Sequence, residues 1–196
     1  MAALTLFLAT ASYGKGLMLL DRVRHSIGED LGRLTPAELS VCGAAHLRSA
    51  IFAARATDRQ TAFDHIEHAR EAARVLGQEA NHYGLEFGPS NVIMHEVAAA
   101  VEMCDGGEAI RRAQHAKLSS AVAPVRLGHY YIDLARGYLY HGDRQRSLEM
   151  LLAARRAAPQ QTRNHPMVRE TVRMLVDLER RRPRNLTGFA SWLGLP

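Results

Sequence analysis

The chain has 196 residues, of which 47% are hydrophobic and 23% charged, and its formal net charge is +5. This composition is ordinary for a globular protein, and the length suffices for one sizeable core. The two cysteines, Cys42 and Cys104, are too few for a disulfide framework or a four-ligand zinc site. Such sparse cysteines favour a reducing, cytoplasmic setting. No apolar run reaches the roughly 18 to 20 residues that span a bilayer, so no membrane contact is expected.

The positive charge is a mild excess rather than a basic stripe. The only dense basic run, RRRPR, covers residues 180–184, and such runs usually lie at solvated helix ends and linkers. Direct recognition of nucleic acid needs Lys and Arg gathered on one face. The composition therefore does not predict a nucleic-acid interface.

At the N-terminus, residues 4–31 predict one or two helices. A break is expected near residues 13–16 (YGKG), because two closely spaced glycines weaken a continuous helix. Residues 1–12 contain a short apolar run, but no basic residues precede it. We therefore interpret this run as part of a helix rather than as a signal peptide.

The strongest helix start lies at Thr35. This residue is suited to the N-cap, Pro36 to the first helical position, and Glu38 completes a capping box. The helix is expected to run to about Arg55. Asp58 then caps a second helix, which a glycine, Gly77, is expected to end.

Further helices follow at intervals set by proline, glycine and aspartate. Their expected positions are from Pro89 or Ser90 to before Asp105, from about Gly107 to Lys117, from Pro124 onward, from Pro166 after Asn164 and His165, and from Leu186 to Leu193. No stretch alternates apolar and polar residues for long enough to predict a strand. The chain is therefore expected to be all-α.

Residues 127–159 read as one complete helix-turn-helix unit of the tetratricopeptide (TPR) kind, whose period is about 34 residues. Small and bulky residues fall at the required offsets: Tyr131, Leu134, Ala135, Tyr138, Ser147, Leu151, Ala154 and Pro159. Weaker copies align through Asp58 and Asp105, which match Asp143 of this unit. Because such a unit cannot bury its apolar face alone, neighbouring units are expected.

The predicted architecture is a right-handed TPR-like helical-repeat solenoid with C-terminal capping helices, forming a single domain over residues 1–196. The repeat units cover about 36–77, 89–118 and 124–159, and the cap covers 165–196. Terminal repeats need such a cap, because their outer face has no neighbour.

Two sequence segments resemble a known family. Residues 87–92 (FGPSNV) with His95, and residues 165–170 (HPMVRE), are similar to segments in the C-terminal TPR-like half of Xre/Cro-type helix-turn-helix transcriptional regulators of high-GC bacteria. The resemblance covers roughly residues 34–195. Those regulators begin with a DNA-binding domain, so contact with DNA is expected only through a domain of that kind, which this sequence lacks.

The resemblance implies a sensor or dimerisation module. Related TPR regulators bind short signalling peptides in a concave groove and pass the signal to a DNA-binding domain. The expected partner is accordingly a peptide or small ligand, or a partner protein, with a homodimer also possible. The alternative is a TPR scaffold or dimerisation module that senses nothing.

Repeat offsets place candidate ligand-binding residues on the first helix of each unit, which lines the concave face in TPR arrays. The candidates from these offsets are Asn91, Met94, His129, Ile132, Arg136 and Tyr140, and His95 joins them because it lies four residues after Asn91 on the same helical face. An Asn amide can both donate to and accept from a peptide backbone, and Arg136 can pair with a carboxylate. The alternative is that Asn91 only caps its own helix and that Arg136 lies in solvent.

No catalytic, metal or cofactor site is predicted. The sequence has no nucleophile elbow, zinc-protease motif or phosphate-binding glycine loop. His65 and His68 share a helix face, but no second cluster supplies the other ligands that zinc requires. Both cysteines are expected to be buried, inert thiols within helices.

Overall fold

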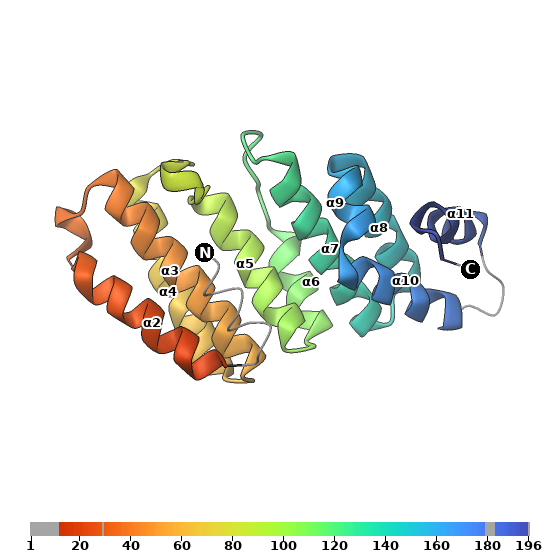
Figure 1. Ribbon diagram of the computed structural model, residues 1–196, viewed down its shortest axis with the longest axis horizontal. Coiled ribbons are helices and arrows are strands. Elements are labelled where there is room, and N and C mark those ends of the chain that lie inside the picture. The colour runs from red at the N-terminus through yellow and green to blue at the C-terminus, as the bar shows by residue number, and fades with distance from the viewer. Residues whose placement is uncertain (1–11, 29, 179–182, 196) are drawn as a thin grey trace. The chain divides into compact units, whose positions relative to one another are not determined.

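The computed structural model describes residues 12–28, 30–178 and 183–195, and every regular element among them is helical (Figure 1). This confirms the expectation of an all-α protein. An isolated β-type bridge joins Ala80 and Phe87. By its internal contacts the chain divides into two compact units, whereas the sequence was interpreted as one continuous array.

The first unit runs up to Met103 and also includes Ala116–Ala121. Its helices are α2 (Tyr13–Ile27), α3 (Pro36–Arg55), α4 (Arg59–Leu76) and α5 (Pro89–Glu102), with short 3-10 turns η1 (Leu31–Arg33) and η2 (His82–Gly84). Helices α3 and α4 form an antiparallel hairpin, and α2 and α5 pack against it (Figure 1).

The ends of these helices follow the predicted caps. The Thr35 hydroxyl accepts from the Glu38 backbone N–H while the Glu38 carboxylate accepts from the Thr35 N–H, so the capping box is present. Asp58 accepts from the N–H of Thr61 at the start of α4, and Gly77 ends α4 in the left-handed conformation. These boundaries confirm the sequence analysis.

Close approach between segments of the first unit depends on two glycines. A Cβ at Gly43 would overlap the ring of Phe87, which is fully buried. A Cβ at Gly16 would lie 2.8 Å from the ring of Phe52. Gly16 therefore lies inside helix α2, where it allows α2 to approach α3. The break expected near residues 13–16 falls at the start of this helix, Tyr13, and not at Gly16.

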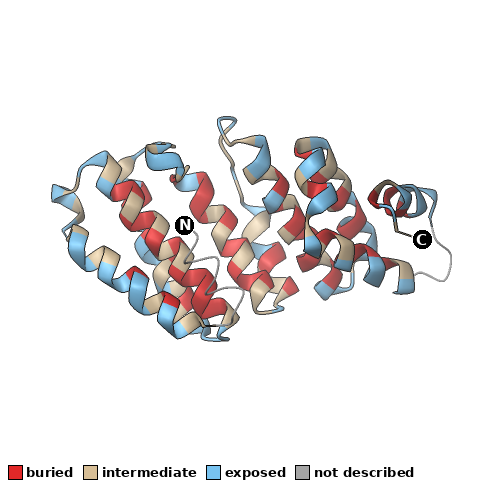
Figure 2. Cartoon of the chain, viewed as in Figure 1, coloured by how far each residue is buried: buried red, intermediate tan, exposed pale blue. Residues whose placement is uncertain are grey.

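The second unit holds Cys104–His115 and the chain from Val122 onward. Its helices are α6 (Gly106–Gln114), α7 (Pro124–His141), α8 (Arg144–Ala157), α9 (Pro159–Asn164), α10 (Pro166–Leu178) and α11 (Arg184–Leu193). Buried residues recur along these helices between exposed ones (Figure 2). One continuous core joins α7, α8, α10 and α11, and its largest buried members are Ile132, Leu151, Leu175, Leu186, Phe189 and Leu193.

Three turns share an unusual backbone feature. Thr57, Cys104 and Gly142 have φ values of 61°, 57° and 90°, and each directly precedes an aspartate that caps the next helix. The left-handed conformation favours glycine and costs other residues energy. A single turn geometry is therefore used three times, with glycine at only one of its copies.

Two expectations need correction, and two others fall wholly or largely outside the described residues. Cys104 lies exposed in the second of these turns rather than buried in a helix, whereas Cys42 is buried as expected. The sequence analysis does not predict the short helix α9, because Pro159 closes a unit in the TPR pattern, whereas in the structure it is the first residue of a helix. The expected helix before Ser12 and most of the basic run at 180–184 lie outside the described residues.

Candidate functional site

The three candidates on α5 are mostly enclosed. Asn91 is 5% exposed and Met94 is 7% exposed. The Asn91 Nδ2 donates to the carbonyl oxygen of Glu86 at 2.9 Å, and His95 Nδ1 lies 2.9 Å from the carbonyl oxygen of Asn91. The Asn91 Oδ1 is buried and has no hydrogen-bond partner within the described part of the chain. Asn91 thus anchors the loop before α5 with one end of its amide.

The rest of that loop is held by a network of side chains. The Glu79 carboxylate accepts from the N–H of Ser90 at 2.8 Å, and the Ser90 hydroxyl accepts from the N–H of Ser119 at 2.9 Å. Asn81 Oδ1 accepts from the N–H of Glu86 at 3.2 Å. The FGPSNV segment therefore has a clear structural role, in which its Phe packs on α3 and its polar groups fasten the loop.

The candidates on α7 form a polar face of a different kind. His129, Arg136 and Tyr140, together with Asp133, recur at spacings of three and four residues, which places them along one side of the helix. His129 is exposed and Tyr140 is 38% exposed. Ile132 is 1% exposed within the core of the second unit, so a ligand on the surface of α7 does not reach it.

Arg136 is the most constrained member of this face. It is only 9% exposed, although arginine is rarely this buried unless it is paired. Its Nη1 lies 3.3 Å from Asp133 Oδ1, and its guanidinium lies 6.0 Å from the centre of the Tyr140 ring. Arg136 is therefore neither in open solvent nor loosely placed, and its charge is oriented by two neighbours on the same helix.

A second histidine extends this face. The ring of His165, which precedes α10, meets the ring of His129 edge to face with centroids 5.2 Å apart. Burial lowers the pKa of His165 to about 4, with further contributions from His129 and Arg136. Although the residue is exposed overall, partial desolvation of its ring, followed by the charge of Arg126, also lowers the pKa of His129. Both imidazoles are therefore neutral near pH 7 and present hydrogen-bonding nitrogens rather than charge.

The predicted candidates fall into two groups that the structure describes separately. Asn91, Met94 and His95 belong to the first unit, and His129, Ile132, Arg136 and Tyr140 belong to the second. Within the second unit, His129, Arg136 and Tyr140 share a face with two residues that the sequence analysis did not select, Asp133 and His165. The spacing along α7 could have indicated Asp133, whereas His165 arrives from a distant segment.

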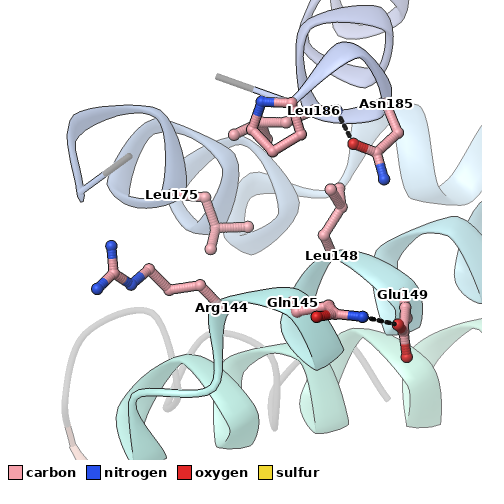
Figure 3. A pocket seen from close by; sticks show the side chains of 8 residues that line it. Arg144, Gln145, Leu148, Glu149, Leu175, Asn185 and Leu186 are labelled. Atoms are coloured by element: carbon pink, nitrogen blue, oxygen red, sulfur yellow. Dashed lines mark hydrogen bonds between the residues drawn. The ribbon is translucent and has the colours of Figure 1, made fainter. Parts of the chain in front are cut away.

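A cavity of about 360 Å³ lies elsewhere in the second unit, between α8, α10 and the start of α11 (Figure 3). Its lining residues are Arg144, Gln145, Leu148, Glu149, Leu175, Pro183, Asn185 and Leu186. The leucines are buried, while the polar members stand exposed at its rim. None of the seven predicted candidates lines it.

The polar rim of this cavity is occupied by internal hydrogen bonds. Gln145 donates to Glu149 at 3.1 Å, and Asn185 Oδ1 accepts from the N–H of Leu186 at 3.0 Å (Figure 3). Arg144 donates to the carbonyl oxygen of Leu178 at 2.8 Å. The Arg144 bond joins α8 to α10, whereas the Gln145 and Asn185 bonds lie within α8 and within α11. Leu148, Leu175 and Leu186 belong to one core shared by α8, α10 and α11, so the cavity is explained by the packing of the cap. Its position depends on where α11 docks, which no local sequence signal encodes.

Among the residues that the structure describes, no group of three or more His, Cys, Asp or Glu side chains is arranged to hold a metal ion. No helix in this part of the chain is long and apolar enough to cross a membrane. No family model, curated protein or solved structure matches the chain. The residues themselves are therefore the basis for any functional proposal.

Proposed function

We propose that this chain is a regulatory helical-repeat domain that binds a signalling peptide or small ligand along the polar face of α7. The observation that carries the proposal is the constrained and nine-tenths buried Arg136, flanked on one helix face by the exposed His129 and Tyr140. A charge that is already oriented loses less conformational freedom when it meets a ligand, so more of the contact appears as affinity.

The chemistry of this face suits an extended peptide or a small acidic molecule. The Arg136 guanidinium can donate to a carboxylate or a carbonyl oxygen, and charge-assisted hydrogen bonds are stronger than neutral ones. The Tyr140 ring offers apolar area with a polar tip. The neutral imidazoles of His129 and His165 can each donate or accept.

The TPR-like and regulator parts of the proposal rest on the sequence. The helical hairpins α3–α4 and α7–α8 are compatible with a TPR-like array, and the FGPSNV and HPMVRE segments resemble those of Xre/Cro-type regulators. On this proposal the domain is not catalytic, and it acts on DNA only through a separate helix-turn-helix domain. Binding on α7 would then alter the geometry of a regulator rather than carry out a reaction.

Native mass spectrometry of the chain purified from its own host tests the proposal. We expect a co-purifying small molecule or peptide that is lost in the Tyr140→Ala variant. The matched control is Met174→Ala on α10, because Met174 is 39% exposed and Tyr140 is 38% exposed. The control should keep the bound mass. A wild-type chain that carries no added mass, or a mass that both variants keep, would remove α7 as a ligand site.

The second candidate function is a scaffold or dimerisation module. It is favoured by two apolar side chains one turn apart on α10, Met174 and Leu178, which are 39% and 51% exposed. Exposed apolar residues that cluster can mark an interface, although single ones are common. Sedimentation of wild type and Leu178→Lys distinguishes this function: a dimer that the substitution dissociates favours a scaffold, and a monomer in both cases argues against self-association.

A further inference from the structure

Three histidines meet between the two long helices of the first unit. His46 on α3 and His65 on α4 approach with their Nδ1 atoms 3.0 Å apart. The ring of His68, one turn further along α4, stacks on the ring of His46 with centroids 4.9 Å apart and planes inclined by 27°. His46 and His65 are partly buried, so this cluster is part of the packing between α3 and α4.

The matching place in the other hairpin is apolar. When Asp58 is aligned with Asp143, His46 aligns with Tyr131 and His65 with Met150. Tyr131 and Met150 pack against the core of the second unit. The α3–α4 hairpin thus has imidazoles at positions where the α7–α8 hairpin has hydrophobic side chains. The turn geometry that the two hairpins share does not require histidine at these positions.

The hydrogen bond between His46 and His65 depends on protonation. It needs one Nδ1 that carries a hydrogen and one that offers a lone pair, so at least one ring must be neutral. When both rings are protonated, the bond is lost and two positive charges face each other at hydrogen-bonding distance. Such like-charge contact is most costly where water is excluded.

Neighbouring charges reinforce this dependence. Arg24 on α2 donates to Ser49 of α3 at 2.8 Å and also pairs with Asp21 at 3.0 Å. Burial, followed by Arg24, lowers the pKa of His46 to about 3 and that of His65 to about 4; their histidine neighbours act in the same direction.

The opposing groups are weaker. Asp64 on α4 and Asp21 on α2 raise the pKa of His65, without offsetting burial and Arg24. Two further titratable groups lie within electrostatic range: Asp58 at the start of α4 interacts with His65, and Cys42 on α3 interacts with Arg24. The surroundings of His46 and His65 therefore favour the neutral form of both imidazoles in the folded hairpin.

We propose that the His46–His65 contact, with His68 stacked on it, is an acid-sensitive latch, which holds α4 against α3 while the imidazoles of His46 and His65 are neutral and releases α4 when these two take up protons. The latch is independent of ligand binding on α7. A cation-binding role is disfavoured by the adjacent Arg24 and by the absence, among the described residues, of a three-ligand arrangement.

The direction of the effect follows from linkage. Histidine in the open hairpin has its ordinary pKa of 6.5, above the values of about 3 and about 4 in the closed one. The open form therefore binds more protons, and opening is favoured as the pH falls from 6.5 toward 4. In the middle of this window two histidines take up about two protons, so the equilibrium constant for opening rises about 100-fold per pH unit.

Hydrogen exchange measured by mass spectrometry on the whole chain tests this latch. Between pH 6.5 and 4.5, after correction for the intrinsic exchange rate, we expect protection in α4 peptides to fall steeply in the wild type. The double variant His46→Tyr/His65→Met carries the residues of the other hairpin, and its α4 protection should change by less than about tenfold over the same range. Peptides from α8 report on the second unit within the same sample.

A second variant keeps the test decisive if the double variant folds poorly. His65→Gln retains a hydrogen-bonding side chain but has no nitrogen that titrates in this range. It should also flatten the pH dependence of α4 protection. The proposal is overturned if wild-type α4 protection does not fall with acid, or if it falls equally in wild type and in the folded variants.

Discussion

The α3–α4 hairpin and the α7–α8 hairpin form the same type of turn with different residues. In both, the N–H of the capping aspartate donates to a carbonyl oxygen five residues earlier, Asp58 to Ala53 and Asp143 to Tyr138, each at 2.9 Å. The residue before the aspartate is left-handed in both, but it is Thr57 in one hairpin and Gly142 in the other. Turn geometry is therefore set by the aspartate cap and the helix end rather than by glycine alone.

The two hairpins also correspond in their seam, which is the buried contact between the two helices of each hairpin. Ala62, Ile66 and Ala69 on α4 align with Ser147, Leu151 and Ala154 on α8, and all six are fully buried. The difference lies beside the seam, where α3–α4 carries histidines and α7–α8 carries Tyr131 and Met150. The two hairpins therefore share their turn geometry and their buried interhelical contacts, and they differ in the residues that flank those contacts.

The largest expected effect comes from truncating the seam in either hairpin. Ile66→Ala and Leu151→Ala should each lower the free energy of unfolding by about 2 to 5 kcal/mol, because each removes a fully buried side chain and leaves a cavity. Urea denaturation followed by circular dichroism measures the loss. The correspondence predicts similar losses, so a loss near zero at one position would mean that the two hairpins are not in the same register.

The next effect comes from exchanging the turn residues. Gly142→Thr should lower the free energy of unfolding by about 1 to 3 kcal/mol, because a β-branched residue is strained at positive φ. No heavy atom lies within 4 Å of a Cβ built at Gly142, so the strain is in the backbone rather than in a clash.

The reverse exchange, Thr57→Gly, gives the matched control. It should stabilise by up to about 1 kcal/mol, since relief of strain is partly offset by the greater chain entropy of glycine when unfolded. Thermal melts of both variants and wild type measure the pair. A Gly142→Thr variant as stable as wild type would show that the aspartate cap carries the turn without regard to φ.

Much of the fold could be predicted from local signals. The capping box at Thr35, the aspartate caps and the left-handed Gly77 and Gly142 all depend on residues within a turn of one another. Cys104 was mispredicted because it lies in a left-handed turn, and glycine is the only residue type that indicates such a turn clearly in a sequence. Gly16 was mispredicted because its close approach to Phe52 of α3 is a tertiary contact.

The candidate sites were less accessible to sequence reasoning. Helical spacing places His129, Arg136 and Tyr140 on one face, but it does not show that Arg136 is nine-tenths buried or that His165 joins it. The pairing of His46 with His65 needs the register between α3 and α4. Histidines on one helix could be found by spacing, whereas a histidine on its partner helix could not.

The smallest expected effect tests a polar contact that only one hairpin has. The Ser147 hydroxyl donates to the carbonyl oxygen of Ala135 on α7 at 2.8 Å, within a fully buried seam, whereas Ala62 stands at the matching place on α4. Ser147→Ala should lower the free energy of unfolding by about 1 kcal/mol, because one buried hydrogen bond is lost. If the seams are equivalent, Ala62→Ser should be tolerated, since its hydroxyl can reach the carbonyl oxygen of Ala50 as Ser147 reaches that of Ala135. Destabilisation by Ala62→Ser much beyond 1 kcal/mol in the same urea experiment would show that α3 and α4 pack more tightly than α7 and α8, and that the histidine cluster lies beside a seam with less room to adjust.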